Sequence, residues 1–175
     1  MPKGKKRHKK RSGGVPHRST KRTALEGLSS MSNLPNIVPF GVVVEDGTTA
    51  AIEISGDPDI PDGTYTFVDA YCSDPQCDCR VVYLMVMTDQ GEGPIAYISL
   101  GWEPVSFYRR WMKAPSRPGA GPVELKGPSL MPLMPQSRLA EPLLKVVRLY
   151  VQDKDPIEFF KARYFTLKAL LSHRS

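Results

Sequence analysis

The sequence contains no long apolar run of the kind that anchors a protein in a membrane. No stretch approaches the roughly 18 apolar residues of a membrane-spanning helix. The N-terminus carries the positive charge of a secretory signal, but it lacks the apolar segment of about 7–15 residues that follows in such signals. We therefore expect a cytoplasmic protein without membrane insertion, in a compartment where thiols stay reduced.

Histidine is scarce, and the common catalytic motifs are missing. The three histidines, His8, His17 and His173, all lie close to the chain ends, which argues against a histidine-based catalytic centre. The chain contains no Walker A motif, no G-x-G-x-x-G, no H-E-x-x-H and no G-x-S-x-G. The sequence therefore does not predict an enzyme of any of these classes.

Cysteine is absent from the whole chain except one short stretch. All three cysteines, Cys72, Cys77 and Cys79, fall within residues 72–79. An odd number leaves no closed set of disulfides, and clustered reduced thiols are typical metal ligands. Asp74 and Pro75 favour a tight turn, which would bring the sulfurs together. The stretch therefore predicts a metal site, with zinc as the first candidate and iron as the second.

The three cysteines leave the fourth ligand of such a site to come from elsewhere. A structural zinc site normally has four protein ligands, and the chain has no fourth cysteine. We expect a carboxylate of the turn, Asp74 first and Asp78 second, or an open position, because the histidines lie in segments prone to fray. A water molecule or a residue of a second subunit would also complete the site. The alternatives without metal are three reduced thiols, or a Cys72–Cys79 disulfide with Cys77 free.

The same stretch carries a resemblance to a known family. The segment YCSDPQCDCR is followed by ISLGWEPVSFYRRW, PQSRLAEPLLK and DPIEFFKARY. Together, over residues 60–170, these segments resemble a family of uncharacterised bacterial proteins in which a Y-C-x-D-P-x-C-D-C-R turn precedes a G-W-E stretch and a C-terminal helical segment. The family has no assigned function, so the resemblance implies no activity.

Acidic residues are absent from the first 22 residues, which carry ten Lys/Arg. Residues 23–110 carry three Lys/Arg against thirteen Asp/Glu, a net charge of −10. Residues 111–175 carry eleven against five, a net charge of +6. The chain thus has a basic start, an acidic first half and a basic second half, and the start alone exceeds the total net charge of +6.

We predict that residues 1–30 form a disordered basic arm, because they offer little apolar surface and their like charges repel. Such a run attracts phosphates through counterion release, which predicts contact with RNA or DNA. The basic run has no aromatic residue for base stacking, so the contact would not be sequence-specific. The predicted polyanion-binding residues are Lys3, Lys5, Lys6, Arg7, Lys9, Lys10 and Arg11.

The remaining residues, 31–175, predict a single α+β domain. Strands rich in β-branched and aromatic residues are expected over 63–72, 80–88 and 95–102, and their short connections favour an antiparallel meander. The middle strand is apolar on both faces and should be covered on both sides. Before them, an extended segment over 37–44, interrupted by Pro39, is expected to pair with 48–55 through a hairpin at residues 45–47. The predicted sheet has three to five antiparallel strands.

Two C-terminal helices are expected to pack on this sheet. Ser137 would cap the first, through about Val151, and Asp155 would cap the second, with Pro156 in its first turn. The second helix carries an apolar stripe that is expected to face the core, namely Ile157, Phe160, Tyr164, Leu167 and Leu171. Residues 106–113 could form a short helix, and residues 113–135 should form a long Pro/Gly-rich loop. Trp102 and Trp111 are expected in the core rather than on a ligand-facing surface.

Two functions from different classes fit this sequence. The first is a small metal-stabilised, non-enzymatic binding or adaptor protein whose arm contacts nucleic acid or another polyanion. The alternative is a metal-dependent, hydrolase-type enzyme that uses the cysteine-bound metal as a Lewis acid, with Asp69, Asp74 or Asp78 beside it. The arm could instead dock on the acidic half of its own chain, act as a solubility tail, serve as a nuclear-targeting signal, or contact an anionic membrane.

Overall fold

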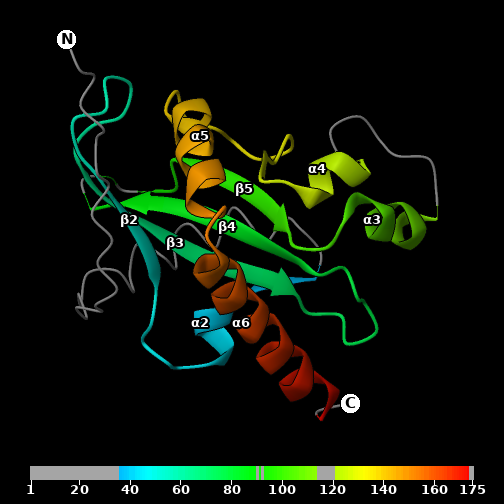
Figure 1. The fold of residues 1–175 in the computed structure, drawn as a ribbon. Helices are drawn as coiled ribbons and strands as arrows, with labels where there is room; N and C mark the ends of the chain where they lie inside the picture. Colours follow the sequence, from blue (N-terminus) through cyan, green and yellow to red (C-terminus); the bar gives the residue numbers. More distant parts are fainter. Residues whose placement is uncertain (1–35, 90, 92, 114–120, 174–175) are drawn as a thin grey trace.

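The computed structural model describes residues 36–89, 91, 93–113 and 121–173 (Figure 1). It contains one antiparallel sheet and several helices, which confirms the α+β class. The predicted basic arm lies outside the described residues. Among the described helices, none has both the length and the apolar character needed to cross a bilayer.

The elements, in chain order, are β1 (Ile37–Pro39), α2 (Phe40–Val43), β2 (Ala50–Ile54), β3 (Gly63–Cys72), β4 (Val81–Thr88), β5 (Ala96–Gly101), α3 (Val105–Met112), α4 (Pro122–Lys126), β6 (Ser129–Leu130), α5 (Ala140–Tyr150) and α6 (Lys154–Ser172).

The centre of the sheet is the meander of β3, β4 and β5, as the sequence predicts. Tyr65 pairs with Thr88, and Val82 pairs with Leu100, so both neighbours of β4 run antiparallel to it. β4 is buried on both of its faces because its alternating positions are all apolar except at its end. A strand of this composition is stable only where both faces of the sheet are covered.

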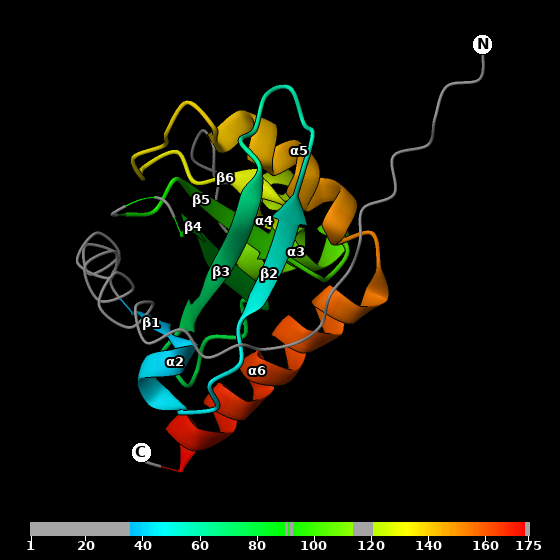
Figure 2. The same cartoon turned by 90° about the vertical axis from the view of Figure 1, so that its left-hand side faces the viewer.

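Different residues pack against the two faces of the sheet. Figure 1 shows α5 and α6 crossing in front of the strands, and the turned view in Figure 2 shows both helices on the same side. Their apolar residues, such as Leu143 and Phe160, join the larger core cluster together with Leu84 of β4. On the opposite face Met131 and Met134 pack against Met85 in a second, smaller cluster.

The predicted hairpin between residues 37–44 and 48–55 is wrong. β1 and β2 do not pair with each other; both pair with β3, where Ile37 lies opposite Cys72 and Ala50 lies opposite Phe67. They lie end to end along one edge of this ten-residue strand. The segment after Pro39 turns into α2 rather than extending, so no second strand is available beside β2.

The segment predicted as the hairpin turn has another partner. Asp46 lies against Arg163 of α6, whose Nη2 donates to Asp46 Oδ1 at 2.7 Å and Oδ2 at 2.8 Å. Arg163 Nη1 donates to Asp69 Oδ1 of β3 at 2.6 Å. The guanidinium also stacks over the ring of Phe40 at 4.2 Å. One buried arginine therefore joins α6, β3 and the segment between α2 and β2.

The boundaries of the C-terminal helices differ from the prediction by a few residues. α5 begins at Ala140 rather than just after Ser137, although the Ser137 hydroxyl does accept a hydrogen bond from the Leu139 N–H at 3.1 Å. α6 begins at Lys154, so Asp153 rather than Asp155 is its N-cap residue. The predicted apolar stripe does face the core, because Phe160, Tyr164 and Leu167 are all buried.

In its described part, the predicted Pro/Gly-rich loop contains only short elements, as expected. α3 forms close to the predicted place, and α4 and the two-residue β6 fall within the predicted loop, of which residues 114–120 lie outside the described part. The prediction that the aromatics here are buried is wrong for Trp111, which is 38% exposed, while Tyr108 is completely buried. Trp102 is half-buried and lies edge-on to Tyr164 at 5.2 Å.

Candidate metal centre

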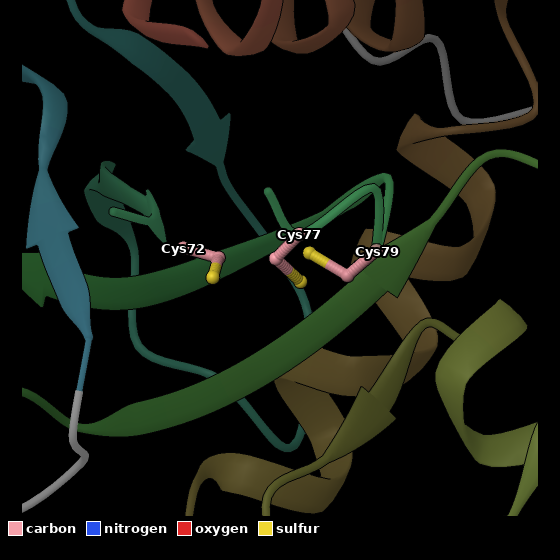
Figure 3. Close-up of side chains that lie close together, drawn as sticks. All are labelled: Cys72, Cys77 and Cys79. Atoms are coloured by element: carbon pink, nitrogen blue, oxygen red, sulfur yellow. The ribbon is translucent and has the colours of Figure 1, made fainter. Parts of the chain in front are cut away.

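The three cysteines meet at one end of the sheet, in the connection between β3 and β4. Cys72 is the last residue of β3, Cys77 lies in the turn, and Cys79 stands two residues before β4 begins. Figure 3 shows the three side chains close together in this connection. All three Sγ atoms lie within 4.8 Å of one another. The predicted cluster is therefore present, and the considered Cys72–Cys79 disulfide is not formed.

Local backbone geometry explains why the turn brings the sulfurs together. Asp74 Oδ1 accepts a hydrogen bond from the Gln76 N–H at 2.9 Å, and Asp74 O accepts one from the Cys77 N–H at 3.1 Å. This is the turn that Asp-Pro sequences favour. Arg80, between Cys79 and the start of β4, has a left-handed backbone conformation with a φ of 51°. Cys79 thus lies within hydrogen-bonding reach of Cys72 just before β4 starts.

Each sulfur has a backbone amide two residues further along the chain as a hydrogen-bond donor. The Asp74 N–H lowers the pKa of Cys72, the Cys79 N–H acts in the same direction on Cys77, and the Val81 N–H acts in the same direction on Cys79. An N–H aimed at sulfur favours the thiolate over the thiol. Hydrogen bonds of this kind to thiolate ligands are a regular feature around protein-bound metals.

Hydrogen bonds among the three thiols shift their pKa values in opposite directions. A hydrogen bond from Cys79 lowers the pKa of Cys72 to about 5, against the effect of burial, with help from the Asp74 N–H, Cys77 and the charge of Lys168. The hydrogen bond with Cys72 raises the pKa of Cys79. Burial and the nearby Cys72 raise the pKa of Cys77. The cluster thus stabilises negative charge at its centre, where a cation would take the place of the shared protons.

Two side chains of α6 donate hydrogen bonds to the turn that carries the cysteines. Tyr164 Oη donates to Cys77 O and to Asp78 Oδ1, each at 3.4 Å. One helical turn later, Lys168 Nζ donates to Asp74 O. Both side chains belong to the helix that packs across the sheet, so the turn is fixed to the core. This role is not predicted from the sequence, although Lys168 stands four residues after Tyr164, the spacing at which two helical side chains share a face.

The other side of the cluster is joined to α3. Arg80 pairs with Asp78 at 2.9 Å and with Glu103 at 3.0 Å. Its backbone carbonyl accepts a hydrogen bond from Tyr108 Oη at 2.9 Å. Its guanidinium lies over the ring of Phe107 at 4.9 Å. The residue that follows the last cysteine therefore sets the position of α3.

The predicted carboxylates do not join the sulfurs. Among the described residues, the group of potential ligand atoms at this place contains only the three cysteines. The carboxylate of Asp74 accepts the Gln76 N–H, and that of Asp78 accepts hydrogen bonds from Arg80 at 2.9 Å. Asp69 is buried further along β3 and is bonded to Tyr71 and Arg163.

The sulfurs fit a tetrahedral thiolate site in kind, but they lie further apart than sulfurs on a bound metal. Ligand sulfurs at about 2.3 Å from a tetrahedral zinc ion lie roughly 3.8 Å apart, whereas the three Sγ atoms lie within 4.8 Å of one another, so a bound metal would draw them closer together. Cys79 is 3% exposed and Cys72 is 9% exposed, while Cys77 is half-buried. The site is thus closed on the sheet side and more open at the turn.

The second predicted site, the run of Lys and Arg from Lys3 to Arg11, lies outside the described residues.

Comparison with known proteins gives no further guide, because no protein-family model, curated protein or solved structure matches the chain. The function is therefore inferred from the chain's own residues.

Proposed function

We propose that Cys72, Cys77 and Cys79 hold a structural metal ion, with zinc as the expected metal, in a cytoplasmic, non-enzymatic binding or adaptor protein. The observation that supports this most is the approach of the three Sγ atoms to within 4.8 Å of one another. The backbone N–H groups aimed at the sulfurs support it further, since they favour thiolates. Thiolate sets of this kind select zinc or iron over calcium and magnesium.

In this proposal a water molecule takes the fourth position. Asp74, the residue first expected there, would have to release the Gln76 N–H before it could coordinate. Asp78 would have to give up its two hydrogen bonds from Arg80. A metal bound by three thiolates on a connection of this length would fix the end of β3 relative to the start of β4. Because the same connection contacts α6 and α3, the metal would stabilise three parts of the fold at once.

A binding role is favoured over the hydrolase alternative by the state of the nearby carboxylates. A hydrolase would need a carboxylate free to accept a proton from a metal-bound water. Asp69 is held by Tyr71 and Arg163, and Asp78 is held by Arg80. Ester or phosphoester hydrolysis that requires the metal and is lost in Asp78→Asn would reverse this preference.

The proposed partner of the arm is a polyanion, with RNA or DNA as the first candidates. The support is the charge of the segment, since residues 1–22 carry ten Lys/Arg and no acid. Replacing Lys3, Lys5, Lys6 and Arg7 by Gln in the full chain should weaken binding to nucleic acid. It should also reduce the slope of log K against log salt by about 3, because each phosphate that a cation neutralises on a single strand contributes roughly 0.7 to that slope.

Substitution with cobalt(II) tests the metal site directly. Cobalt in a thiolate site gives intense sulfur-to-metal charge-transfer absorption, so a titration reports both the stoichiometry and the ligands. The wild type should bind one equivalent and release it to zinc, and Cys77→Ser should lose most of the absorption. Gln76→Ala, which changes a neighbouring exposed residue of the same turn, is the matched control. Equal spectra for Cys77→Ser and wild type would contradict the proposal.

A further inference from the structure

The outer edge of β2 is open among the described residues. β1 and β2 lie end to end along β3, and from β3 the sheet continues only towards β4, β5 and β6. Figure 2 shows β2 as the outermost strand, beside β3. In a strand paired on one side, every second residue turns its backbone N–H and C=O outward. No described residue outside β3 forms a backbone hydrogen bond with Ala50–Ile54, so this edge can accept an extended segment as a further strand.

The composition of β2 leaves this edge unprotected. Natural edge strands are commonly blocked by Lys, by Pro or by a bulge, and β2 contains neither Lys nor Pro. Its pairing with β3 is regular over all five residues, without a bulge. Its one charged residue, Glu53, is exposed. A negatively charged edge favours a basic partner over a second copy of itself.

Acidic residues precede, occupy and follow β2. Residues 36–79 contain nine Asp/Glu and no Lys or Arg, and three of the nine are paired with Arg80 or Arg163. The acids close to β2 in the chain that form no ion pair with another described residue are Glu45, Glu53, Asp57, Asp59 and Asp62. The last three line an open hollow whose lining includes one cation, Arg138. The outer edge of β2 and these five acids are called the acidic edge here.

The chain itself carries a segment that matches the acidic edge in charge and length. Residues 3–11 contain seven Lys/Arg, no acid and no Pro, so each of them has a backbone N–H to offer to a strand. Nine residues are enough to lie along the five of β2. A segment linked to the folded part reaches an effective concentration up to the millimolar range. A basic segment of another protein would therefore have to displace it.

The position of β1 brings this segment within reach of the acidic edge. β1 begins opposite Cys72 of β3, whereas β2 lies opposite residues 63–67. At about 3.4 Å per residue of strand, β2 lies about 17–31 Å from Ile37. Arg11 precedes Ile37 by 26 residues, which extend to about 85 Å at most. Residues 3–11 can therefore reach the whole length of β2 without any movement of a described element.

We propose that residues 3–11 bind along the acidic edge of the same chain in extended form, and that nucleic acid has to displace them. The inference rests on the proposed binding of polyanions by the arm and adds the regulation of that binding. While the segment is docked, its Lys and Arg side chains neutralise the unpaired acids. Once it is released, the same side chains are available to phosphates. The affinity for nucleic acid is then reduced in proportion to the fraction of molecules whose arm is free.

Carbodiimide cross-linking of the full chain tests the docking without any nucleic acid. This reagent joins a Lys amine to a carboxylate that it contacts, and mass spectrometry identifies the linked peptides. The five Lys of residues 3–11 should couple to Glu53, Asp57, Asp59 and Asp62. These links should disappear at about 1 M salt, where interactions between exposed charges are screened beyond roughly 3 Å. Links spread equally over Glu141 and Asp155, which are exposed acids of α5 and α6, would overturn the docking site.

A cation placed on the edge should block the docking. Ala51→Lys adds a charge to an exposed position of β2 and should abolish the links, because Lys on an edge strand opposes the approach of a further basic strand. Ala162→Lys adds the same charge to an exposed position of α6 and is the matched control. Its links should equal those of wild type, and equal links in both variants would contradict the proposal. Unchanged thermal melting of each variant shows that the fold is intact.

Hydrogen exchange tests whether the segment pairs with the β2 backbone. Replacing Lys3, Lys5, Lys6 and Arg7 by Gln should speed the exchange of the peptide that spans β2, because its outward N–H groups lose a partner. The peptide that spans β5 should exchange at the same rate in both proteins. Equal exchange of the β2 peptide in the two proteins would show that the arm does not pair with this strand.

The competition with nucleic acid is measured by fluorescence anisotropy with the full chain and a labelled oligouridine. Glu53→Gln combined with Asp59→Asn removes two exposed acids of the acidic edge, and Glu141→Gln combined with Asp155→Asn is the matched control. Both changes raise the net charge by the same amount, so a general electrostatic gain cancels. The acidic-edge variant should bind about 2- to 30-fold more tightly than the control, since two exposed ion pairs shift a docking equilibrium by about this factor. Equal affinities would overturn the competition.

The outcomes separate this inference from the proposed function and from other occupants of the edge. Cross-links to the acidic edge in a protein that binds no oligonucleotide would support the docking and overturn the nucleic-acid role. Oligonucleotide binding without such links, and with equal affinities of the matched variants, would do the reverse. In a mixture of light and nitrogen-15-labelled chains, links only between light and heavy chains would show that a second copy is the occupant. Protection of β2 that arises only after addition of oligolysine would show that the occupant is a basic partner. Either result would overturn docking within one chain.

Discussion

At the scale of single residues, the buried ion network around Arg163 connects distant parts of the chain. Its side chain is 7% exposed and that of Asp69 is 5% exposed, and the two are paired at 2.6 Å. Charges this deeply buried are stable only when they are paired and hydrogen-bonded. Asp46, partly exposed at the rim, supplies the second carboxylate. The network therefore depends on every member being present.

Replacing Arg163 by Met should lower the free energy of unfolding by about 3–5 kcal/mol, because it leaves Asp69 buried without its partner. Lys161→Met is the matched control, since Lys161 pairs with Glu158 on the surface and such pairs contribute about 0.2–1 kcal/mol. Urea denaturation followed by circular dichroism measures both. Equal losses in the two variants would show that the network is not a stabilising feature of the core.

The same network predicts a pH dependence for Asp46. Burial opposes its ionised form, but hydrogen bonds from Arg163 and Thr48 outweigh burial, so the pKa lies below the ordinary value of 3.8. A carboxyl group with a lowered pKa in the folded state stabilises it above its unfolded pKa. That contribution disappears as the pH falls through the folded pKa.

Asp46→Asn should therefore be less stable than wild type at pH 7, and the difference should shrink as the pH falls below about 4. Urea denaturation of both proteins over this pH range gives the difference directly. Asp59→Asn, an exposed carboxylate elsewhere in the acidic half, serves as the control. A stability difference that stays constant down to the lowest pH at which the protein folds would contradict the assignment.

At the scale of elements, Gly101 allows α3 and α4 to approach the end of β5. A Cβ at this position would lie 2.5 Å from Leu125 O and would also overlap the Tyr108 hydroxyl. Gly101→Ala should lower the free energy of unfolding by about 1–3 kcal/mol, the usual cost of overpacking. Gly41→Ala is the control, because nothing lies within 4 Å of a Cβ at that position. Thermal melts of both variants check this, and equal melting temperatures would show that the packing around Gly101 is loose.

The hydrogen bonds between α6 and the cysteine turn should influence the proposed metal site without supplying a ligand. Lys168→Met removes the donor to Asp74 O, and Tyr164→Phe removes the donor to Cys77 O and Asp78. The two changes together should weaken zinc binding about 10- to 100-fold, the usual effect of removing groups that position metal ligands. Competition with a chromophoric chelator measures the affinity. Ser172→Ala, on the exposed end of the same helix, should leave it unchanged.

At the scale of the whole molecule, the sequence predicts correctly those elements whose structure follows from the order of apolar and polar residues within the element itself. β4 is predicted to be central because it is apolar on both faces, and α6 is predicted to be amphipathic because its apolar stripe has helical spacing. β1 and β2 are mispaired in the prediction because the partner of a strand of three to five residues is decided by the long edge of β3. No local signal near Pro39 identifies that edge.

The candidate metal centre likewise has one part that the sequence predicts and another that it does not. The approach of the sulfurs could be predicted because the cysteines are close in sequence and an Asp-Pro turn lies between them. The hydrogen bonds from Tyr164 and Lys168 join residues 87 and 94 positions apart, so no local pattern shows them. Arg163 could have been recognised, since it stands three residues after Phe160 and four before Leu167, on the buried side of α6.

The central claim is that the cysteine turn is a metal site, and native mass spectrometry of protein expressed without a histidine tag tests it most directly. Wild type should carry one zinc ion in its folded form and lose it on denaturation. Cys77→Ser should carry none and should unfold at a lower temperature. Folded, metal-free wild type with three titratable thiols, equal in stability to Cys77→Ser, would contradict the claim.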